Sequence, residues 1–512
     1  MNHIFIPEKK TIVSMPSFYE IVLNPLRRCL NDDAGKDAFY IDGKSYTYGS
    51  FGEIINSIRE AVAKCSDIIV GLVIRDDMET YASIIALWME GKAYVPLHPF
   101  HPHERNLEIV RQVGLNYIID TSKKTEFSNL NVINPKKMAI SGERFDDFVS
   151  ISDDALAYIL FTSGSTGKPK GVRITRGNVA SFMDSFWKTG IFISSEDRCL
   201  QCFDLTFDVS VQSFLVALTR GACLYTVPYG QVKYLYVASL IHEQHITFGA
   251  MAPSMLTYLR PYFGELDAAS LKSCILTAEA CPVDLLEEWS HCAVNADLYD
   301  FYGPTEATIY CTYYKYNRGE DNLSSNGIVS IGKPLANVQW IIIDEEGNAL
   351  LEMGKGELCI AGPQLSPGYW NDDEKNKASF FVRLAKGDEI RYYHTGDLCY
   401  MDVSGNLMYV ERIDRQAKIQ GFRVELSEIE FYAREFYHNK ARVVAMACNN
   451  AQDLSEIALF VESTQIDPNE LLSYLREKMP AYMIPSRVIF EDEFPINSSD
   501  KIDRKKLKDK LL

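Results

Sequence analysis

Residues 162–171, TSGSTGKPKG, concentrate groups that bind phosphate, directly after the apolar run LAYILF. Glycines let backbone N–H groups approach phosphate oxygens, and hydroxyls and lysines add charge-assisted hydrogen bonds. The spacing differs from the common phosphate loop, G-x-x-x-x-G-K-[ST]: Gly164 lies three residues before Gly167, and Pro169 follows Lys168. The segment alone predicts a phosphate-binding loop and does not identify a reaction.

Two acidic residues elsewhere lie in turns suited to a nucleotide. In FYGPTEATIY (301–310), Glu306 follows a Gly-Pro turn, where a carboxylate can hold Mg²⁺ beside phosphates. In YYHTGDL, Asp397 follows a Thr-Gly turn at the end of an expected strand, where it can accept hydrogen bonds from both ribose hydroxyls. Together with the loop, these residues predict a site for a magnesium-bound nucleotide.

Composition limits the classes of function. The chain has 512 residues, enough for roughly two to four domains, with 47% apolar and 24% charged residues, as in ordinary soluble proteins. A net charge of −17 argues against general nucleic-acid binding. The twelve cysteines are scattered through apolar segments, and we expect reduced core thiols. The lone CxxC, Cys199 and Cys202, has no second pair nearby, so we expect neither zinc nor redox chemistry there.

No targeting segment is predicted from the sequence. The start, MNHIFIPEKK, lacks a cationic stretch followed by an apolar core, so no secretory signal is predicted. No apolar run approaches the about 18 residues of a membrane span. We therefore expect a cytoplasmic protein without membrane insertion.

The elements that must carry these residues alternate between apolar runs of strand length and longer amphipathic stretches, which predicts an α/β fold. Examples are the strand-like DIIVGLVI and the helix-like NLEIVRQV. From about 330 to 412 the pattern changes to short strands, and the turns DEEGN and DVSGN predict hairpins. Helix–strand alternation then returns, which predicts a domain boundary near 412–415.

Seven motifs in one fixed order identify a family. They run from GKAYVPLHPFHPHER (91–105) through the loop, FYGPTEATIY, GELCIAGPQLSPGYW, YYHTGDL and ERIDRQAKIQGFRVELSEIE to FPINSSDKIDRKKL. In this order they make nearly the whole chain resemble the adenylate-forming superfamily, specifically the amino-acid adenylation enzymes of nonribosomal peptide synthesis and their free-standing relatives. Members join a carboxylic acid to the α-phosphate of ATP, release pyrophosphate, and pass the acyl group to a thiol.

The resemblance implies the cofactors, ATP and Mg²⁺, and the architecture. We expect a large N-terminal domain, 1–413, of layered α/β subdomains with a small β-barrel-like subdomain. A small mobile α+β domain, 414–512, should rotate about Asp414 between the two half-reactions.

The resemblance also implies roles for individual residues. Tyr302 would pack on adenine, Thr305 would contact the α-phosphate, and Glu306 would bind magnesium. Asp397 would bind ribose, and Arg412 would contact ribose or phosphate. Lys501 would bridge the substrate carboxylate and the α-phosphate, because attack of one anion on another needs a cation at the shared oxygens. The loop that covers the β- and γ-phosphates would contribute Thr162, Ser163, Gly164, Ser165, Thr166, Gly167, Lys168 and Lys170.

The acid that is activated is expected to be an amino acid. Asp208, in FDLTFDVSVQSF, takes the family position that pairs with the substrate α-ammonium, whereas aryl and fatty acid ligases usually lack an acid there. A compact, largely apolar side chain such as that of alanine, proline, glycine or serine is expected. The other implied pocket residues are Val209, Gln212, Ala250, Leu276, Ala278, Phe301, Ile309 and Tyr310.

Three positions depart from the family pattern. Asp500 replaces the usual glycine before Lys501, His394 replaces an arginine or lysine before the TGD segment, and Ala278 stands where glycine is common. None removes an atom that the chemistry requires, although Asp500 puts an anion beside Lys501.

Other functions compete with this interpretation. The leading hypothesis is a free-standing adenylation enzyme that loads the phosphopantetheine thiol of a separate carrier protein, since no carrier motif follows Lys501. A D-alanine–carrier-protein ligase of cell-wall modification shares every motif, but usually has cysteine at the position of Thr277. An acyl- or aryl-CoA ligase is disfavoured by Asp208. A non-catalytic scaffold would have no need for intact Glu306, Asp397 and Lys501.

Overall fold

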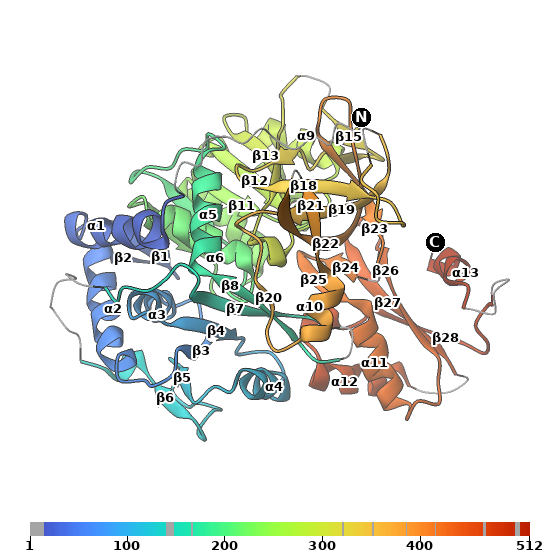
Figure 1. The fold of residues 1–512 in the computed structure, drawn as a ribbon, viewed down its shortest axis with the longest axis horizontal. Coiled ribbons are helices and arrows are strands. Elements are labelled where there is room, and N and C mark those ends of the chain that lie inside the picture. Colours follow the sequence, from blue (N-terminus) through green and yellow to red (C-terminus); the bar gives the residue numbers. More distant parts are fainter. Residues whose placement is uncertain are drawn as a thin grey trace. The chain divides into compact units, whose positions relative to one another are not determined.

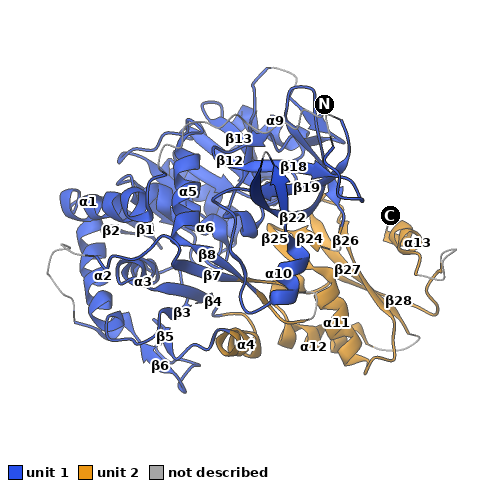
Figure 2. Cartoon of the chain, in the orientation of Figure 1, with its two compact units in different colours: residues 1–99, 113–160, 171–413 blue, residues 100–112, 161–170, 414–512 orange. Residues whose placement is uncertain are grey.

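The structure, a computed structural model, describes residues 15–139, 148–164, 167–319, 322–350, 353–385, 387–414, 416–463, 467–496 and 502–511. It divides into two compact units, coloured in Figure 2. Unit 1 comprises residues 1–99, 113–160 and 171–413. Unit 2 comprises residues 414–512 together with two segments from earlier in the chain, 100–112 and 161–170.

Two large sheets form the frame of unit 1 (Figure 1). The first has the order β20-β8-β7-β4-β3-β5-β6, and its central strands run parallel. Buried apolar runs form these strands, as expected for a parallel sheet covered on both faces. Their bounds are β3 (Ile69–Val73), β4 (Ala93–Leu97), β5 (Tyr117–Ile119), β6 (Asn131–Ile133), β7 (Leu156–Thr162), β8 (Lys170–Thr175) and β20 (Gly368–Tyr369).

The second sheet has the order β17-β14-β13-β12-β11-β9-β10-β1-β2. Its strands from β13 to β1 are parallel, and β14, β17 and β2 add antiparallel edges. The bounds are β1 (Asp37–Ile41), β2 (Lys44–Thr47), β9 (Arg198–Gln201), β10 (Cys223–Thr226), β11 (Phe248–Met251), β12 (Ser273–Thr277), β13 (Asp297–Tyr302), β14 (Thr312–Lys315) and β17 (Lys333–Pro334).

Four α-helices of unit 1, α2, α3, α5 and α10, begin at residues whose side chains accept from free backbone N–H groups. Thr175 and Asn178 form a reciprocal capping box at the start of α5, and Thr47 caps α2. The bounds are η1 (Tyr19–Leu23), α1 (Asn24–Asp32), α2 (Tyr48–Val62), α3 (Met78–Met89), η2 (Pro135–Lys137), α5 (Arg176–Trp187), α6 (Asp208–Leu218), α7 (Lys233–Gln244), α8 (Pro253–Leu259), η3 (Arg260–Tyr262), α9 (Val283–Cys292), η4 (Thr305–Ala307) and α10 (Asp373–Ser379).

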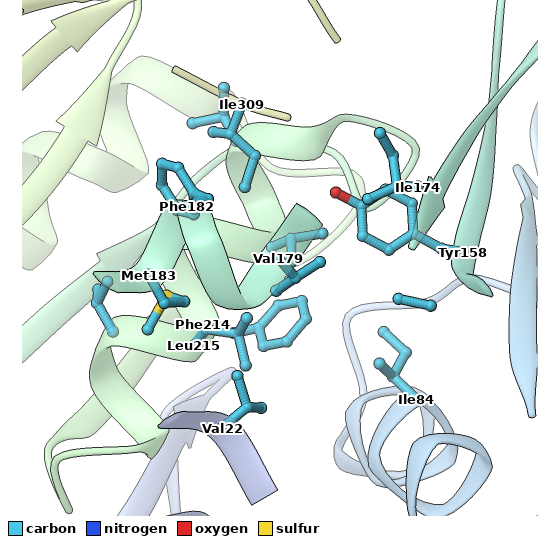
Figure 3. Close-up of a cluster of buried hydrophobic side chains, with 14 of the residues drawn as sticks. Val22, Ile84, Tyr158, Ile174, Val179, Phe182, Met183, Phe214, Leu215 and Ile309 are labelled. Carbon is cyan, nitrogen blue, oxygen red and sulfur yellow. The ribbon is translucent and has the colours of Figure 1, made fainter. Parts of the chain in front are cut away.

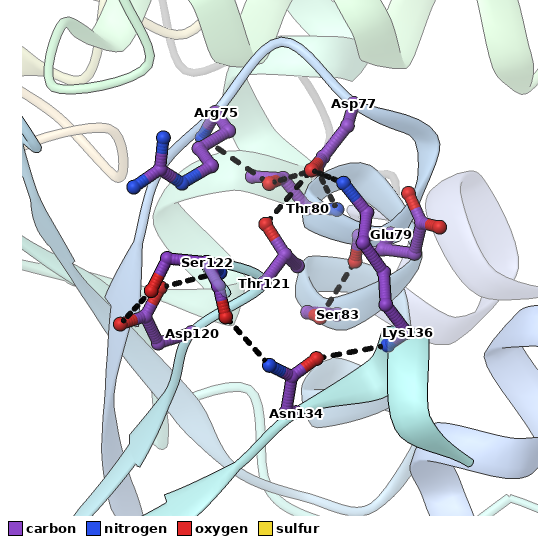
Figure 4. Close-up of polar contacts among 10 residues, drawn as sticks. All are labelled: Arg75, Asp77, Glu79, Thr80, Ser83, Asp120, Thr121, Ser122, Asn134 and Lys136. Carbon is purple, nitrogen blue, oxygen red and sulfur yellow. Dashed lines mark hydrogen bonds and ion pairs between the residues drawn. The ribbon is translucent and has the colours of Figure 1, made fainter. Parts of the chain in front are cut away.

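The cap of α3 is part of a polar network that ties three segments together (Figure 4). Asp77 accepts from the backbone N–H of Thr80 at 3.0 Å, from Thr121 at 2.8 Å, and pairs with Lys136 Nζ at 2.8 Å. Burial raises the pKa of Asp77, but the hydrogen bonds from Lys136 and Thr80 outweigh it and leave the pKa below its ordinary value. The ionised carboxylate therefore fixes the start of α3 to the edge of the first sheet.

A third sheet, entirely antiparallel, fulfils the expectation of short strands and hairpins after residue 330. Its order is β18-β19-β22-β21, and β23 pairs with the C-terminal part of the long strand β22. Both expected turns join antiparallel neighbours, DEEGN after β18 and DVSGN between β22 and β23. The bounds are β18 (Gln339–Ile343), β19 (Gly356–Ala361), β21 (Phe380–Ala385), β22 (Asp388–Met401) and β23 (Leu407–Arg412). The strands β15 (Ser324–Ser325) and β16 (Ile328–Val329) form a separate antiparallel pair.

Unit 2 is an α+β unit with its own core, built by Ile429 of α11, Leu459 of β27 and Leu471 and Leu475 of α12. The three-stranded sheet β26-β27-β28 pairs antiparallel and then parallel, and β24 and β25 form a hairpin. The bounds are α4 (His103–Val113), β24 (Gln416–Ile419), β25 (Phe422–Glu425), α11 (Leu426–Phe436), β26 (Val443–Asn449), β27 (Ser455–Glu462), α12 (Pro468–Lys478), η5 (Ala481–Met483), β28 (Arg487–Glu491), α13 (Arg504–Lys508) and η6 (Asp509–Leu511).

The main core of unit 1 is organised around Trp88 on α3. Its ring is fully buried, packs edge-on against Phe18 at 5.4 Å between centroids, and donates from Nε1 to the carbonyl of Ala157 at 2.9 Å. Arg176 at the start of α5 donates to the carbonyl of Trp88 at 2.7 Å. Figure 3 shows another part of this cluster, where side chains of α5 and α6 meet Ile84 and Ile309.

The cysteines agree with the expectation from sequence. All twelve are free thiols, and burial raises the pKa of the Cys202 thiol to about 11. Among the residues that the structure describes, no helix combines the length and the apolar character needed to cross a membrane.

Replacing Trp88 by alanine should lower the free energy of unfolding by about 3–5 kcal/mol, because it leaves a large cavity and an unpaired carbonyl in the core. Urea denaturation followed by circular dichroism measures the change. Phe192→Ala, at a side chain that is 80% exposed, is the control and should shift stability by less than about 0.5 kcal/mol. Equal effects of the two substitutions would contradict this description of the core.

Candidate functional site

The hairpin of β22 and β23 joins three residues assigned to the nucleotide. Asp397 and Arg412 are direct cross-strand partners, and Arg412 Nη1 lies 2.9 Å from Asp397 Oδ1. Tyr302, at the end of β13, donates its hydroxyl to Asp397 Oδ2. The structure thus joins the buried Tyr302 and Asp397 with the partly buried Arg412 in one cluster, with Asp397 as its centre.

The turn before Asp397 is braced by His394, one of the departures from the family pattern. His394 Nδ1 lies 2.7 Å from Glu357 Oε2, and Glu357 Oε1 accepts from the backbone N–H of Gly396 at 2.9 Å. Cys359 Sγ lies 3.8 Å from His394 Nδ1, so the three side chains also form the kind of group that could hold a metal. Burial raises the pKa of the Cys359 thiol far above its ordinary value, and Glu357 has its oxygens engaged, so we interpret the group as the support of the turn.

Glu306 is fully buried in the single helical turn η4, directly after the Gly-Pro turn. Tyr369 of β20 donates its hydroxyl to Glu306 Oε1 at 2.6 Å, and the backbone N–H of Ser366 donates to the carbonyl of Glu306 at 2.8 Å. Gly303 is required here: an added Cβ would lie 2.5 Å from the carbonyl oxygen of Ile309. The chain can therefore double back on itself at this point only with glycine.

The segment that doubles back is strained. Thr308 and Ile309 have φ angles of +56° and +73°, which are rare for β-branched residues. Gln364 holds this backbone in place, since its carbonyl accepts from the Thr308 hydroxyl at 2.6 Å and its Nε2 donates to the carbonyl of Tyr310 at 2.7 Å. Such strain persists only where surrounding contacts enforce it, and it is common at functional sites. Here it directs Ile309 and Tyr310 into the core beside α6.

Asp208 is the first residue of α6 and is buried, with 7% of its surface exposed. Its Oδ2 has no hydrogen-bond partner among the described residues. Burial raises its pKa to about 6, a hydrogen bond from Thr305 opposes this shift, and the nearby Glu306 adds to it. A buried carboxylate with an unpaired oxygen is costly alone and is suited to receive a cation.

Most of the other predicted pocket residues lie with Asp208 in the main core of unit 1. α6 contributes Val209 and the fully buried Gln212, and the carboxyl ends of parallel strands meet beside it, as is usual for ligand sites in α/β sheets. The residues in this cluster are Val209, Ala250, Phe301, Ile309 and Tyr310. Ala278 follows β12 with a φ of +70°, which explains why glycine suits this position.

Leu276 lies in a different core cluster from the other predicted pocket residues, and its place in the pocket stays a prediction. Ala250 pairs with Ile275, and Met251 pairs with Leu276, in the register of β11 and β12. Because side chains alternate across a sheet, Leu276 points to the opposite face from Ala250 and belongs to the second core cluster of unit 1. Motif alignment does not reveal on which side of β12 each residue lies.

The phosphate-type loop belongs to unit 2, where it contacts the start of α11. The hydroxyl of Ser163 accepts from the backbone N–H of Glu425 at 2.9 Å and donates to the carbonyl of Arg423 at 3.1 Å. The backbone N–H of Gly164 donates to Glu428 Oε2 at 3.0 Å, and Arg105 Nη1 lies 2.6 Å from Glu428 Oε1. The Glu428 carboxylate is thus an anion that accepts a hydrogen bond from the backbone of the loop.

The lysines of the loop differ in their surroundings. Lys170 is buried and its Nζ lies 3.0 Å from Glu425 Oε1, whereas Lys168 is largely exposed and lies 3.6 Å from Glu108. Thr162 Oγ1 is buried without a hydrogen-bond partner in the described part of the chain. An added Cβ at Gly164 would lie 1.9 Å from the carbonyl oxygen of Lys168, so the turn requires glycine.

Three predicted site residues lie outside the described part of the chain, and a fourth, Asp414, lies within it. Ser165, Thr166 and Lys501, together with the unusual Asp500, lie outside the described residues. Asp414, where unit 2 resumes, accepts from the backbone N–H of Gln416 at 3.0 Å.

Several contributors were not identified from the sequence. Tyr369 and Gln364 belong to GELCIAGPQLSPGYW, and Glu425 and Glu428 to RVELSEIE, motifs used only to recognise the family. The spacing of Glu425 and Glu428, three residues apart at a helix start, was the available signal that they share a face.

Comparisons with known proteins identify the family of the chain. A family model described as AMP-binding enzyme matches residues 26–370. The chain is 33% identical over 450 residues to tyrocidine synthase 3 of Brevibacillus parabrevis, a match that covers 86% of this chain and 7% of that protein. It is 31% identical over 483 residues to zwittermicin A synthase ZmaJ of Bacillus cereus, covering 91% of this chain and 90% of that protein.

Solved structures show the fold. The Vibrio cholerae adenylation domain AlmE, in complex with glycyl-adenosine-5'-phosphate, matches with a TM-score of 0.83 and 24% identity, covering 96% of this chain and 97% of that one. PA1221, which contains adenylation and PCP domains, matches with a TM-score of 0.83 and 21% identity, covering 97% and 84%. The chain has the expected α/β adenylation fold, while it spans less than a tenth of the length of tyrocidine synthase 3.

The raised pKa of Asp208 predicts a stability difference that depends on pH. The folded state favours the protonated carboxyl, so its stabilisation is complete below the unfolded pKa near 3.8 and is lost as pH rises through about 6. Asp208→Asn should therefore gain stability relative to the natural protein between pH 4.5 and 7.5, on the order of 1–2 kcal/mol. Urea denaturation at both pH values measures it. Asp373→Asn, on the exposed first turn of α10, is the control; a difference at position 208 that does not change with pH would contradict the burial argument.

Proposed function

The chain belongs to the family of AMP-binding enzymes and is an AMP-forming ligase, and within this family we propose that it adenylates a small amino acid and transfers it to a carrier protein. The observation that carries the choice of an amino acid is the buried Asp208 carboxylate with its unpaired oxygen. A substrate ammonium would supply the missing partner, while a fatty or aryl acid would leave the carboxylate buried alone.

The proposed reaction has two balanced steps. In the first, a carboxylate oxygen of the amino acid attacks the α-phosphorus of ATP, the bond to the β-phosphate oxygen breaks, and pyrophosphate leaves. In the second, the phosphopantetheine thiol loses its proton to solvent, its sulfur attacks the acyl carbon, and AMP leaves. Both steps depend on the positioning of the reactants and on groups that stabilise negative charge on the shared oxygens. We assign this stabilisation to the Lys501 ammonium and to a hydrogen bond from Thr305.

The nucleotide is assigned to the cluster around Asp397. Tyr302 would pack on adenine, and Asp397 would accept the ribose hydroxyls with Arg412 beside it. The chemistry of the buried Glu306 carboxylate fits a magnesium ion, which when bound would neutralise phosphate charge. Tyr369 holds Glu306 at 2.6 Å and thereby fixes its orientation.

We further propose that Asp414 is the hinge between half-reactions. It lies where the chain passes from unit 1 to the long final segment of unit 2. Rotation there would withdraw Lys501 after adenylation and present residues 418–423 to the thiol. The loop of residues 162–170, which requires glycine at Gly164, would hold pyrophosphate and then release it.

We propose a short substrate side chain because bulky aromatic residues surround the proposed pocket. Tyr310 lies between Phe182 and Phe301, at 5.8 and 5.0 Å between ring centroids, and these rings would limit the length of the substrate. AlmE, solved with glycyl-adenosine-5'-phosphate, supports the same conclusion by analogy. A D-alanine–carrier-protein ligase is the alternative within this class, and preference for one enantiomer separates the two.

Amino-acid-dependent exchange of labelled pyrophosphate into ATP, screened over both enantiomers of small amino acids, tests the proposal. We expect exchange with at least one of them, and a loss of at least about 100-fold on replacing Lys501 by alanine, since a transition-state cation is removed. Lys505→Ala, in the same basic tail, is the control. Exchange with only fatty or aryl acids would contradict the proposal.

The pKa of Asp208 also predicts how substrate affinity depends on pH. The α-ammonium needs the ionised carboxylate, so KM for the amino acid should rise about tenfold for each pH unit below about 6 and be flat above it. Exchange measured from pH 5 to 8, with saturating ATP, gives this profile. A KM that stays constant down to pH 5 would show that Asp208 is not the counter-ion.

A further inference from the structure

Gln212 carries a buried amide that the mechanism above does not use. It lies on α6 one turn after Asp208, and it is completely inaccessible to solvent. Its Nε2 has no hydrogen-bond partner among the residues that the structure describes. Buried amide groups are nearly always paired, so an unpaired one beside a candidate substrate pocket needs an explanation.

The contact of Gln212 Oε1 with Tyr310 sets the orientation of this amide. Tyr310 donates its hydroxyl to Gln212 Oε1 at 3.4 Å, and it also has a hydrogen bond with Thr277. With Phe182 and Phe301 packed against the Tyr310 ring, that hydroxyl has little freedom. Since Oε1 faces Tyr310, the two N–H groups of Nε2 face another direction.

A second buried polar atom lies on the side of Asp208. The hydroxyl of Tyr158 on β7 has no partner in the described part of the chain, and Asp208 lies close enough to raise the pKa of Tyr158 beyond the effect of burial. Asp208 Oδ2 is unpaired as well among these described residues. The region around the start of α6 thus holds an anion, an amide donor and a hydroxyl that can each receive a ligand group.

We propose that this pocket takes an amino acid whose short side chain ends in a hydrogen-bond acceptor, a hydroxyl or a carbonyl, which accepts from Gln212 Nε2. This inference rests on the proposed function, in which Asp208 pairs with the α-ammonium. Residues four apart on a helix have Cβ atoms about 5–6 Å apart, which brings both ends of one small amino acid within reach of the two side chains.

An apolar substrate would leave the amide buried and unpaired. A site that hydrogen-bonds a substrate group discriminates strongly against the analogue lacking it, whereas an apolar pocket discriminates more weakly, and against the hydroxyl. Among the four amino acids compatible with the sequence, serine alone carries such a group. The structure therefore favours serine over alanine, glycine and proline.

Pyrophosphate exchange with two nearly isosteric pairs, serine with alanine and threonine with valine, tests the inference. In the natural protein kcat/KM should be at least about tenfold higher for serine than for alanine. Gln212→Met keeps the length of the side chain and removes both donors, so it should abolish the preference for serine over alanine. Gln244→Met, at the end of α7, is the matched control and should keep the natural ratio.

The outcomes separate the two proposals. Exchange that prefers alanine in the natural protein, or a serine preference that survives Gln212→Met, overturns the inference and leaves amino-acid adenylation intact. No exchange with any amino acid overturns both. Thermal denaturation monitors folding of the variant, and if Gln212→Met does not fold, the ratio measured on the natural protein decides alone.

Discussion

The carboxylate of Asp208 is the charge on which the proposed specificity depends. It lies at the first residue of α6, inside the main core of unit 1, with one oxygen unpaired among the described residues. Burial raises its pKa to about 6, so near neutral pH the free protein holds a largely ionised and poorly solvated carboxylate. Burying this carboxylate lowers the free energy of unfolding, and a cationic substrate compensates for that loss when it pairs with the carboxylate. The surrounding backbone must keep water out and leave room for one small ligand.

That requirement accounts for the unusual backbone between residues 303 and 310. Gly303 permits a contact that any side chain would block, and the positive φ angles of Thr308 and Ile309 turn the chain back towards α6. Gln364 Nε2 donates to the carbonyl of Tyr310 in this strained segment, and the Tyr369 hydroxyl donates to Glu306 Oε1. One short segment therefore contributes to both proposed sites: Tyr302 contacts Asp397 in the proposed nucleotide site, and Tyr310 contacts Gln212 in the proposed amino-acid pocket.

Much of this was predictable from sequence, and the limits have physical causes. The α/β pattern and the hairpins follow from apolar periodicity and turn residues, whereas the grouping of Tyr302, Asp397 and Arg412 at a nucleotide was implied by resemblance to the family and stays a prediction. The side of β12 on which Leu276 lies, opposite to that of Ala250 on the neighbouring strand, is set by the sheet register, which motif spacing does not resolve. The pairing of Gly164 with Glu428, and the state of Gln212 Nε2, are tertiary facts that no local pattern encodes. Likewise, the membership of residues 161–170 in unit 2 depends on contacts formed across more than two hundred residues of sequence.

The most direct test of the account compares two non-hydrolysable adenylate analogues, glycyl-sulfamoyl adenosine and its acetyl counterpart, by calorimetric binding at pH 7.5. They differ only in the α-ammonium, so the comparison isolates its pairing with Asp208 from the nucleotide and side-chain contacts. The account predicts that the glycyl analogue binds at least about 100-fold more tightly, and that Asp208→Asn removes the difference. Equal affinity for the two analogues would contradict it.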